Sequence, residues 1–92
     1  MPLEFSLDEA RAVLSAAHAL APHGLRVPLS EADCVTLVNA GIEIKDPGRG
    51  LVDFPTTIEG YPAYWCWLAG EPEIGWWHRR DAGFAGRRPI PG

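Results

Sequence analysis

The fold is decided by an apolar stretch in the C-terminal half, residues 61–78, which reads YPAYWCWLAGEPEIGWWH. This stretch holds all four tryptophans of the chain and is interrupted once, by the turn-forming segment Gly70-Glu71-Pro72. Runs rich in aromatic residues and bounded by glycine and proline are typical of β-strands. We therefore predict two antiparallel strands here, at about residues 61–68 and 74–78.

Two more strands are predicted upstream of this stretch. Residues 42–45 alternate apolar and polar side chains, as a half-buried strand does, and residues 51–54 form a further apolar run. The turn at residues 46–50, DPGRG, separates these two strands, and Glu59-Gly60 marks the next reversal. Because connections this short join neighbouring antiparallel strands, the sequence predicts a four-stranded antiparallel meander.

Two helices are predicted on the N-terminal side of the sheet. Ser6 and Glu9 form a capping box, and apolar residues then recur at helical spacing, which predicts a helix over about residues 7–20. Ser30 begins a second helix over about residues 31–39. The predicted fold class is therefore α+β, with two N-terminal helices packed on the four-stranded meander and a C-terminal tail that wraps the sheet.

Length and composition restrict the class of protein. At 92 residues the chain is expected to form one domain, residues 1–92, with its tail at residues 79–92. Its hydrophobic content of 47% excludes a disordered protein. No apolar run approaches the roughly 18 residues of a membrane span, and no signal-peptide pattern is visible. With only two cysteines, the sequence predicts a cytoplasmic protein that has no membrane partner.

Charge is distributed unevenly along the chain. Residues 1–78 hold four Lys and Arg against eleven Asp and Glu, a net charge of −7. Residues 79–92 hold four arginines against one aspartate, a net charge of +3. A basic tail on an acidic body usually pairs with its own body or with a second copy. Since four arginines are a small basic surface, we do not expect a nucleic-acid partner.

The tryptophans predict a sheet that is apolar on both faces. We expect Trp65 to lie opposite Trp76, which leaves Tyr64, Cys66 and Trp77 on the other face. Two short helices can cover only one face of such a sheet. A second copy of the chain, the C-terminal tail or a flat ligand could cover the other face. We favour a homodimer, which could also bind another protein through this aromatic surface.

Polar residues around the predicted sheet could form a binding site. Imidazole and carboxylate groups are ligands of divalent metals, and the candidate metal ligands are Asp53, Glu71, His78 and Asp81. An arginine could instead anchor an anion beside an aromatic wall, and the candidate ligand-binding residues are Asp53, Glu71, Trp77, His78 and Arg87. The spacing matches no metal motif, so a structural histidine that is hydrogen-bonded to a carboxylate is the alternative.

Cys66 admits two interpretations. Together with His78 and an acid such as Asp53, it could form a thiol nucleophile. A cysteine inside a tryptophan-rich strand is more typical of a small buried hydrophobe with an inert thiol, and we favour that interpretation.

Several short motifs resemble a known family. They are GLVDFP at residues 50–55, CW at 66–67, GEPEI at 70–74, WH at 77–78 and GFAGR at 83–87, with FSLDEA at residues 5–10. Over about residues 5–14 and 41–90, the chain resembles the bacterial family of uncharacterised cytoplasmic proteins known as domain-of-unknown-function family 2203. The resemblance implies no activity. It singles out four polar positions, which fit either a binding site or a buried salt-bridge network that holds the tail to the sheet: Asp53, Glu71, His78 and Arg87.

Two hypotheses of function follow from the sequence. We expect a non-enzymatic cytoplasmic protein that self-associates as a homodimer and has no cofactor. The alternative is a small protein that binds a divalent metal or an anionic ligand around His78, Asp53 and Glu71, and that could be hydrolytic.

Overall fold

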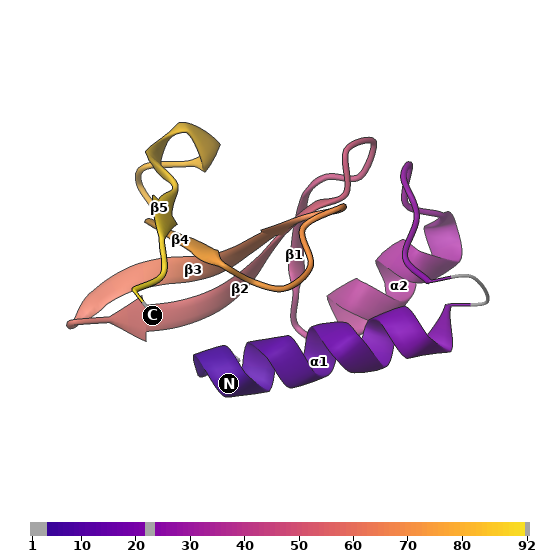
Figure 1. The fold of residues 1–92 in the computed structure, drawn as a ribbon, viewed down its shortest axis with the longest axis horizontal. Helices are drawn as coiled ribbons and strands as arrows, with labels where there is room; N and C mark the ends of the chain where they lie inside the picture. Colours follow the sequence, from indigo (N-terminus) through magenta and orange to yellow (C-terminus); the bar gives the residue numbers. More distant parts are fainter. Residues whose placement is uncertain (1–3, 22–23, 92) are drawn as a thin grey trace.

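The computed structural model of the chain describes residues 4–21 and 24–91. It shows an antiparallel sheet with helices along one face (Figure 1). The elements are α1 (Leu7–Leu20), α2 (Glu31–Asn39), β1 (Glu43–Asp46), β2 (Leu51–Ile58), β3 (Tyr61–Leu68), β4 (Trp76–Arg79), the 3-10 turn η1 (Phe84–Gly86) and β5 (Arg88–Pro89). The strands are hydrogen-bonded in the order β1-β2-β3-β4-β5, each antiparallel to the next. No helix in these described ranges is long and apolar enough to cross a membrane.

Both helices occupy the predicted residues because local hydrogen bonds set where they begin. The Ser6 hydroxyl accepts from the Glu9 backbone N at 3.1 Å, and the Glu9 carboxylate accepts from the Ser6 backbone N at 2.9 Å. These hydrogen bonds from Ser6 lower the pKa of Glu9, because they stabilise its charged form. The Ser30 hydroxyl accepts from the Asp33 backbone N at 3.0 Å and caps α2 in the same way.

The hydrophobic core lies between the helices and one face of the sheet. Buried side chains from α1 and α2 join buried side chains from the sheet in one cluster, whose central members include Ala10, Leu14, Leu37, Val52, Phe54 and Trp67. This is the arrangement predicted for the two helices, and it leaves the opposite face of the sheet for other residues.

Strand β2 is longer than predicted, because it continues past Asp53-Phe54 to Ile58. Pro55, which lacks an N–H, would break a central strand. However, β1 pairs with β2 only as far as Asp53, so Pro55 lies where β2 has one open side. The Pro55 carbonyl points to that open side and accepts from the Phe5 backbone N at 2.8 Å. Proline therefore removes no hydrogen bond of the β2–β3 ladder.

The predicted register between β3 and β4 is wrong by one residue, because Trp65 lies opposite Trp77 rather than Trp76. The connection between the strands is not a tight hairpin. The Glu71 side chain enters it and accepts from the Leu68 backbone N at 2.7 Å, so β4 begins only at Trp76. Since side chains alternate between faces, Trp76 instead of Trp77 shares a face with Cys66.

The sheet has five strands in the described residues, where four were predicted. The additional strand, β5, consists of two tail residues that pair with Trp76 and Trp77. The tail also lies over the second face of the sheet, where Arg87 stacks 4.8 Å from the centre of the Trp76 ring. Arg87 Nη2 donates to both carboxylate oxygens of Glu71 at 2.8 Å. The tail therefore adds an edge strand to the sheet and reaches part of its second face, and the Arg87–Glu71 pair fastens it.

We expect the Glu71→Gln substitution to loosen the tail. The Glu71 and Arg87 side chains are only 21% and 11% exposed, so loss of the charge leaves a largely buried guanidinium without its counter-ion. Hydrogen bonds to charged groups contribute about 1.5–3 kcal/mol, and the free energy of unfolding should fall by an amount in this range. Urea unfolding followed by tryptophan fluorescence measures it.

Glu73→Gln is the matched control, because Glu73 is 65% exposed and contacts Arg11 only at 3.5 Å. This exposed substitution should change the free energy of unfolding by less than about 0.5 kcal/mol. Equal effects of the two substitutions would show that the Arg87–Glu71 pair does not hold the tail.

Candidate functional site

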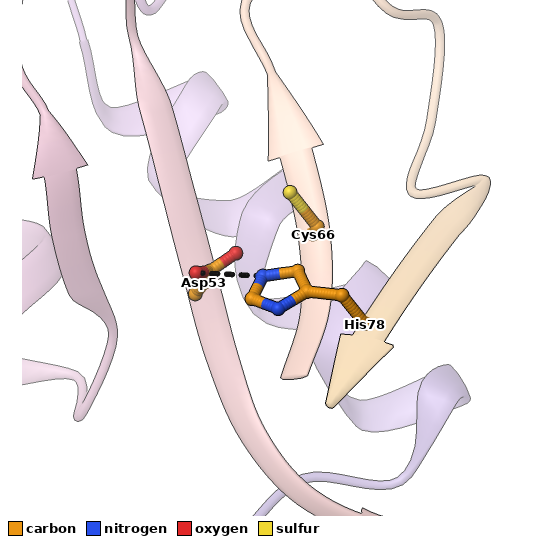
Figure 2. Close-up of side chains that lie close together, drawn as sticks. All are labelled: Asp53, Cys66 and His78. Atoms are coloured by element: carbon orange, nitrogen blue, oxygen red, sulfur yellow. Dashed lines mark hydrogen bonds and ion pairs between the residues drawn. The ribbon is translucent and has the colours of Figure 1, made fainter. Parts of the chain in front are cut away.

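Three buried polar side chains converge on the face of the sheet opposite the helices (Figure 2). Asp53 comes from β2, Cys66 from β3 and His78 from β4, and Asp53 is the register partner of Cys66. One ligand-type atom from each residue lies within 4.8 Å of the other two. The residues are 2%, 1% and 3% exposed, respectively, so all three are shielded from solvent. We refer to these three residues as the Asp-Cys-His cluster.

Both ring nitrogens of His78 are hydrogen-bonded. Nδ1 lies 2.8 Å from the carbonyl oxygen of Arg79, and Nε2 lies 3.0 Å from Oδ2 of Asp53. Because a carbonyl oxygen only accepts, Nδ1 carries a hydrogen and donates it. This leaves Nε2 as the ring nitrogen that faces the Asp53 carboxylate.

Asp53 has a second oxygen with no such partner. Oδ1 is buried and has no hydrogen bond of good geometry among the described residues, although Asp53 lies close enough to the Cys66 thiol for a weak hydrogen bond to help raise the pKa of Cys66. Buried polar atoms are almost always hydrogen-bonded, so an orphaned carboxylate oxygen calls for an explanation. It belongs to the same carboxylate that the Nε2 atom of His78 contacts, and it therefore points to a ligand that the Asp-Cys-His cluster could hold.

The Cys66 thiol is neutral in this environment. Burial raises the pKa of Cys66 to about 12, and the nearby negative charge of Asp53 adds to the rise. Arg87 acts in the opposite direction but does not compensate. The thiolate is the nucleophilic form of cysteine, so a thiol with this pKa is not an activated nucleophile. The prediction that Cys66 is buried is confirmed.

A small cavity of about 210 Å³ adjoins the Asp-Cys-His cluster. All three residues of the cluster line it, and its other walls come from β1, β2, β3 and the tail. The polar members of those walls are Lys45, Tyr64 and Arg80, and the apolar members include Leu51 and Phe84. The cluster is therefore buried in the protein but faces a space that a small ligand could occupy.

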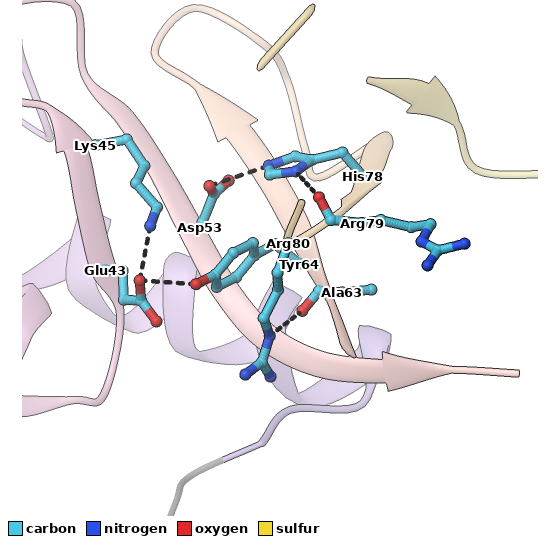
Figure 3. A network of polar contacts seen from close by, with 8 residues as sticks. All are labelled: Glu43, Lys45, Asp53, Ala63, Tyr64, His78, Arg79 and Arg80. Carbon is cyan, nitrogen blue, oxygen red and sulfur yellow. Dashed lines mark hydrogen bonds and ion pairs between the residues drawn. The ribbon is translucent and has the colours of Figure 1, made fainter. Parts of the chain in front are cut away.

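A second polar network lies beside the Asp53–His78 pair (Figure 3). Glu43 accepts from Lys45 Nζ at 2.7 Å and from the Tyr64 hydroxyl at 2.9 Å. Partial burial alone would raise the pKa of Glu43, but the hydrogen bonds from Lys45 and Tyr64 outweigh it and the pKa is lowered. Burial, followed by the hydrogen bond to Glu43, raises the pKa of Tyr64. Glu43 thus holds Lys45 and Tyr64 in place beside the Asp-Cys-His cluster.

Of the candidate residues from the sequence, Asp53 meets His78 and Glu71 meets Arg87, whereas Asp81 and Trp77 join neither pair. Asp81 is exposed and lies 3.4 Å from Arg79. Trp77 lies on the opposite face of the sheet from His78, with Arg88 beside its ring.

Cys66 was not predicted as a metal ligand, and Lys45, Tyr64 and Arg80 were not predicted as site residues. A usable signal was present in the Glu59-Gly60 turn. A two-residue turn at this point makes Ile58 the partner of Tyr61, and counting back along both strands then pairs Asp53 with Cys66. No comparable signal in the sequence predicts that Arg80, which follows the end of β4, lies beside this cavity.

A larger cavity, of about 500 Å³, lies between α1 and residues 71–74. Its lining residues Arg11 and Glu73 pair with each other at 3.5 Å above an apolar floor that includes Leu14 and Trp67. Within residues 4–21 and 24–91, the only close group of three metal-type side chains is the Asp-Cys-His cluster. The smaller cavity is therefore the stronger candidate site.

Comparison with known proteins identifies the family. The family described as uncharacterized conserved protein (DUF2203) matches residues 26–90. This chain belongs to the DUF2203 family. The match contains the Asp-Cys-His cluster, Glu71 and Arg87, whereas the similar motif at residues 5–10 lies outside it. No curated protein and no solved structure matches the chain significantly. The description of DUF2203 names no activity, so the function has to be argued from the site.

We expect the two cysteines to differ strongly in their reaction with iodoacetamide. In the native protein at about pH 8, Cys34, which is partly exposed, should be alkylated first, while Cys66 should react only when urea unfolds the chain. Mass spectrometry of the digested protein measures the extent of alkylation at each of the two cysteines. Rapid alkylation of Cys66 in the folded Cys34→Ser variant would contradict the neutral, buried thiol.

The same thiol gives a pH dependence with a defined sign. Its pKa in the folded protein, about 12, is above the ordinary value of 9.0, so the folded state holds the proton more tightly. The free energy of unfolding should fall as the pH rises from 9 toward 12. Because other groups titrate in this range, the measurement is the difference in urea stability between the natural protein and Cys66→Ala.

Proposed function

We propose that this protein binds a divalent transition-metal ion through Asp53, Cys66 and His78, and that Zn²⁺ fits the donor set best. The observation that supports the proposal is the gathering of one oxygen, one sulfur and one nitrogen donor within 4.8 Å, from three neighbouring strands. The orphaned Oδ1 of Asp53 is the second observation, since a bound cation would give this buried atom a partner.

The distances are compatible with a tetrahedral ion. Zinc–ligand bonds of about 2.0–2.3 Å place neighbouring ligand atoms about 3.5 Å apart. The atoms of the Asp-Cys-His cluster already lie within 4.8 Å of one another. A contraction of about 1 Å, within the reach of side-chain rotation, would close the site around an ion.

The hydrogen bond behind His78 suits a metal ligand. Histidines that bind metals commonly donate the second ring N–H to a backbone carbonyl or a carboxylate, which fixes the tautomer and the ring orientation. In His78 that donor is Nδ1 and the acceptor is the Arg79 carbonyl, at 2.8 Å. This arrangement leaves Nε2, the nitrogen that faces Asp53, as the coordinating atom.

Charge balance also favours a divalent cation. A thiolate from Cys66, a carboxylate from Asp53 and a neutral imidazole from His78 would sum to zero charge with a 2+ ion. The loaded site would therefore place no net charge in a buried position, which would be costly.

The donor types distinguish among metals. Magnesium and calcium prefer oxygen ligands in sets of six or more, whereas thiolate and imidazole suit zinc and its first-row neighbours. Three protein ligands leave one position of a tetrahedral zinc ion open, as in catalytic rather than structural sites. An ion held in this way would supply a Lewis acid for hydrolytic chemistry.

The test is to titrate the protein with Zn²⁺ and with Co²⁺. We expect one equivalent to bind, and at 100 times the dissociation constant the native state should gain about 2.7 kcal/mol of stability. Coordination by Cys66 should give cobalt a thiolate-to-metal charge-transfer band. Cys66→Ala should abolish this band and weaken binding at least about tenfold, while Cys34→Ser, which lies outside the cluster, should leave both unchanged.

Asp53→Asn provides a second variant of nearly the same size, in case Cys66→Ala disturbs the core. This substitution removes the carboxylate charge but keeps one oxygen. It should therefore lower the affinity for the metal without removing the thiolate-to-metal band. Urea unfolding confirms that each variant is folded. A natural protein that is folded, reduced and gives neither a bound metal nor a band would refute the proposal.

We also propose that the chain self-associates, through α2 instead of the aromatic face of the sheet. A dimer through that face was expected because the face was predicted to be apolar and uncovered. The tail lies over part of it, with Arg87 stacked on Trp76, so less apolar surface is left there for a second copy. Two apolar side chains on α2 are exposed instead. Val35 is 54% and Val38 is 57% exposed, and residues three apart share one side of a helix.

Light scattering at micromolar concentration tests this second proposal. The natural protein should have the mass of a dimer, and the double substitution Val35→Lys with Val38→Lys should give a monomer. Thr36→Lys adds one positive charge, half that of the double substitution, to an exposed position of α2 outside the Val35–Val38 row and should leave the dimer intact. A natural protein that is monomeric in this range would rule the dimer out.

A further inference from the structure

We propose that residues 83–87 form a lid over the Asp-Cys-His cluster, which opens to let the metal ion enter or leave and is latched by the Arg87–Glu71 pair. We refer to this segment as the 83–87 lid. The inference rests on the proposed metal-binding function. It goes further by naming the part of the chain that controls access to the site.

An ion in solution has no direct path to the Asp-Cys-His cluster. Its three residues are at most 3% exposed. On one side they are backed by the sheet and the hydrophobic core, and on the other they line the 210 Å³ cavity. A wall of this cavity therefore has to move before an ion can reach the cluster.

Most of the cavity wall cannot move without disrupting the sheet. Arg80 follows β4 directly, and two backbone carbonyls of β2 and β3 accept from its side chain at 3.1 and 3.2 Å. Gly83 and Phe84 also line the cavity, and both belong to the 83–87 lid. The remaining wall residues lie in β1, β2, β3 and β4, where the strand ladders hold them: Lys45, Leu51, Asp53, Tyr64, Cys66 and His78.

The backbone of the 83–87 lid is bonded chiefly to itself. Gly86 N donates to the Gly83 carbonyl and Arg87 N donates to the Phe84 carbonyl, each at 3.1 Å. The turn η1 buries none of its residues. Figure 1 shows the η1 coil beyond β4, on the side of the sheet away from α1. A segment with few buried contacts can open locally while the rest of the protein stays folded.

Side chains hold the 83–87 lid closed. Arg87 Nη2 donates to both carboxylate oxygens of Glu71 at 2.8 Å. The Arg87 guanidinium also lies 4.8 Å from the centre of the Trp76 ring and 4.9 Å from the centre of the Phe84 ring. Phe84, which forms part of the cavity wall, is thus held by the same side chain that pairs with Glu71. Separation of Arg87 from Glu71 would therefore release this wall.

The latch has one unsatisfied group. Arg87 Nε is buried and has no hydrogen-bond partner among the residues that the structure describes. A buried donor without an acceptor raises the free energy of the closed state, whereas water would satisfy the same group once the lid opens. The closed 83–87 lid is therefore poised to open, unlike the fully paired β2–β3 ladder.

Gly83 provides a way to disturb the closed lid without removing a contact. Its φ angle is 65°, in the left-handed region that favours glycine. A Cβ atom at this position would meet no heavy atom within 4 Å beyond its own chain neighbours. Gly83→Ala therefore causes no clash and disfavours only the backbone conformation of the closed lid.

The first experiment measures opening without metal, through alkylation of Cys66 by iodoacetamide in the Cys34→Ser background. The natural sequence should react slowly at about pH 8, because the closed lid shields the thiol. Glu71→Gln, which weakens the latch, and Gly83→Ala should each speed the reaction of Cys66 at least about tenfold. Urea unfolding confirms that each variant is folded.

Glu73→Gln and Gly75→Ala are the matched controls. Glu73 is 65% exposed, and a Cβ atom on Gly75 also meets open space, at a φ angle outside the left-handed region. Both should leave the alkylation rate of Cys66 within about twofold of the natural rate.

Ile42→Val controls for global unfolding. Ile42 is buried in the core and does not line the cavity, so its substitution lowers the stability of the whole fold without touching the lid. Alkylation rates that follow urea stability across all the variants, Ile42→Val included, would overturn the inference, because global unfolding would then be what exposes Cys66.

The second experiment follows the entry of Co²⁺ after rapid mixing, through the thiolate-to-cobalt band. Because opening precedes binding, the observed rate should level off as the cobalt concentration increases. Glu71→Gln and Gly83→Ala should raise this limiting rate at least about tenfold and should also speed the release of cobalt to EDTA. Glu73→Gln and Gly75→Ala should change neither rate.

The outcomes separate this inference from the metal proposal. No cobalt band in the natural protein means that the metal proposal fails, and the alkylation of Cys66 then still decides whether the lid opens over the cluster. A cobalt band that appears equally fast in the natural protein and in both lid variants overturns the lid and leaves metal binding standing. Faster alkylation and faster cobalt uptake in both lid variants, with unchanged controls, support it.

Discussion

The two-residue turn Glu59-Gly60 is the constraint on which the rest of the structure depends. Both residues have positive φ angles, 52° and 83°, the geometry that joins two antiparallel strands with no residue to spare. It sets eight consecutive pairs between β2 and β3 and places Asp53 opposite Cys66. A slip of one residue would move every side chain of one strand to the other face. The chemistry of the Asp-Cys-His cluster is thus decided at a turn on the far end of the hairpin.

It is unusual for so small a protein to bury three polar residues together. A chain of this size has little surplus stability, and an apolar residue at position 53 or 78 would pack without any hydrogen-bonding requirement. The structure instead covers the cluster with its own tail, through Phe84 and the Arg87–Glu71 pair. A cover of this kind shields the polar cluster from water and leaves a small space beside it.

How much could be predicted from the sequence depended on the range of the interactions. The helix starts were predicted correctly because Ser6 and Ser30 cap residues only three positions away. The register of β4 was missed because the Glu71 side chain takes the place of a backbone partner, and no local pattern reveals that. Asp53 and His78 were recognised as candidates, but their meeting with Cys66, and the arrival of Arg80 at the same cavity, depend on the exact register of three consecutive strands.

The two edges of the sheet bear on how the protein behaves at high concentration. One edge, β1, is four residues long, carries Lys45 and has an irregularity between Ile44 and Asp46. The other edge, β5, is a two-residue strand whose Pro89 has no N–H to donate. Short, charged, bulged or proline-bearing edges do not template the addition of strands from other molecules. The long strands β2 and β3 lie between these two edges, and where β2 extends beyond β1 its open side begins with Pro55, which has no N–H to donate.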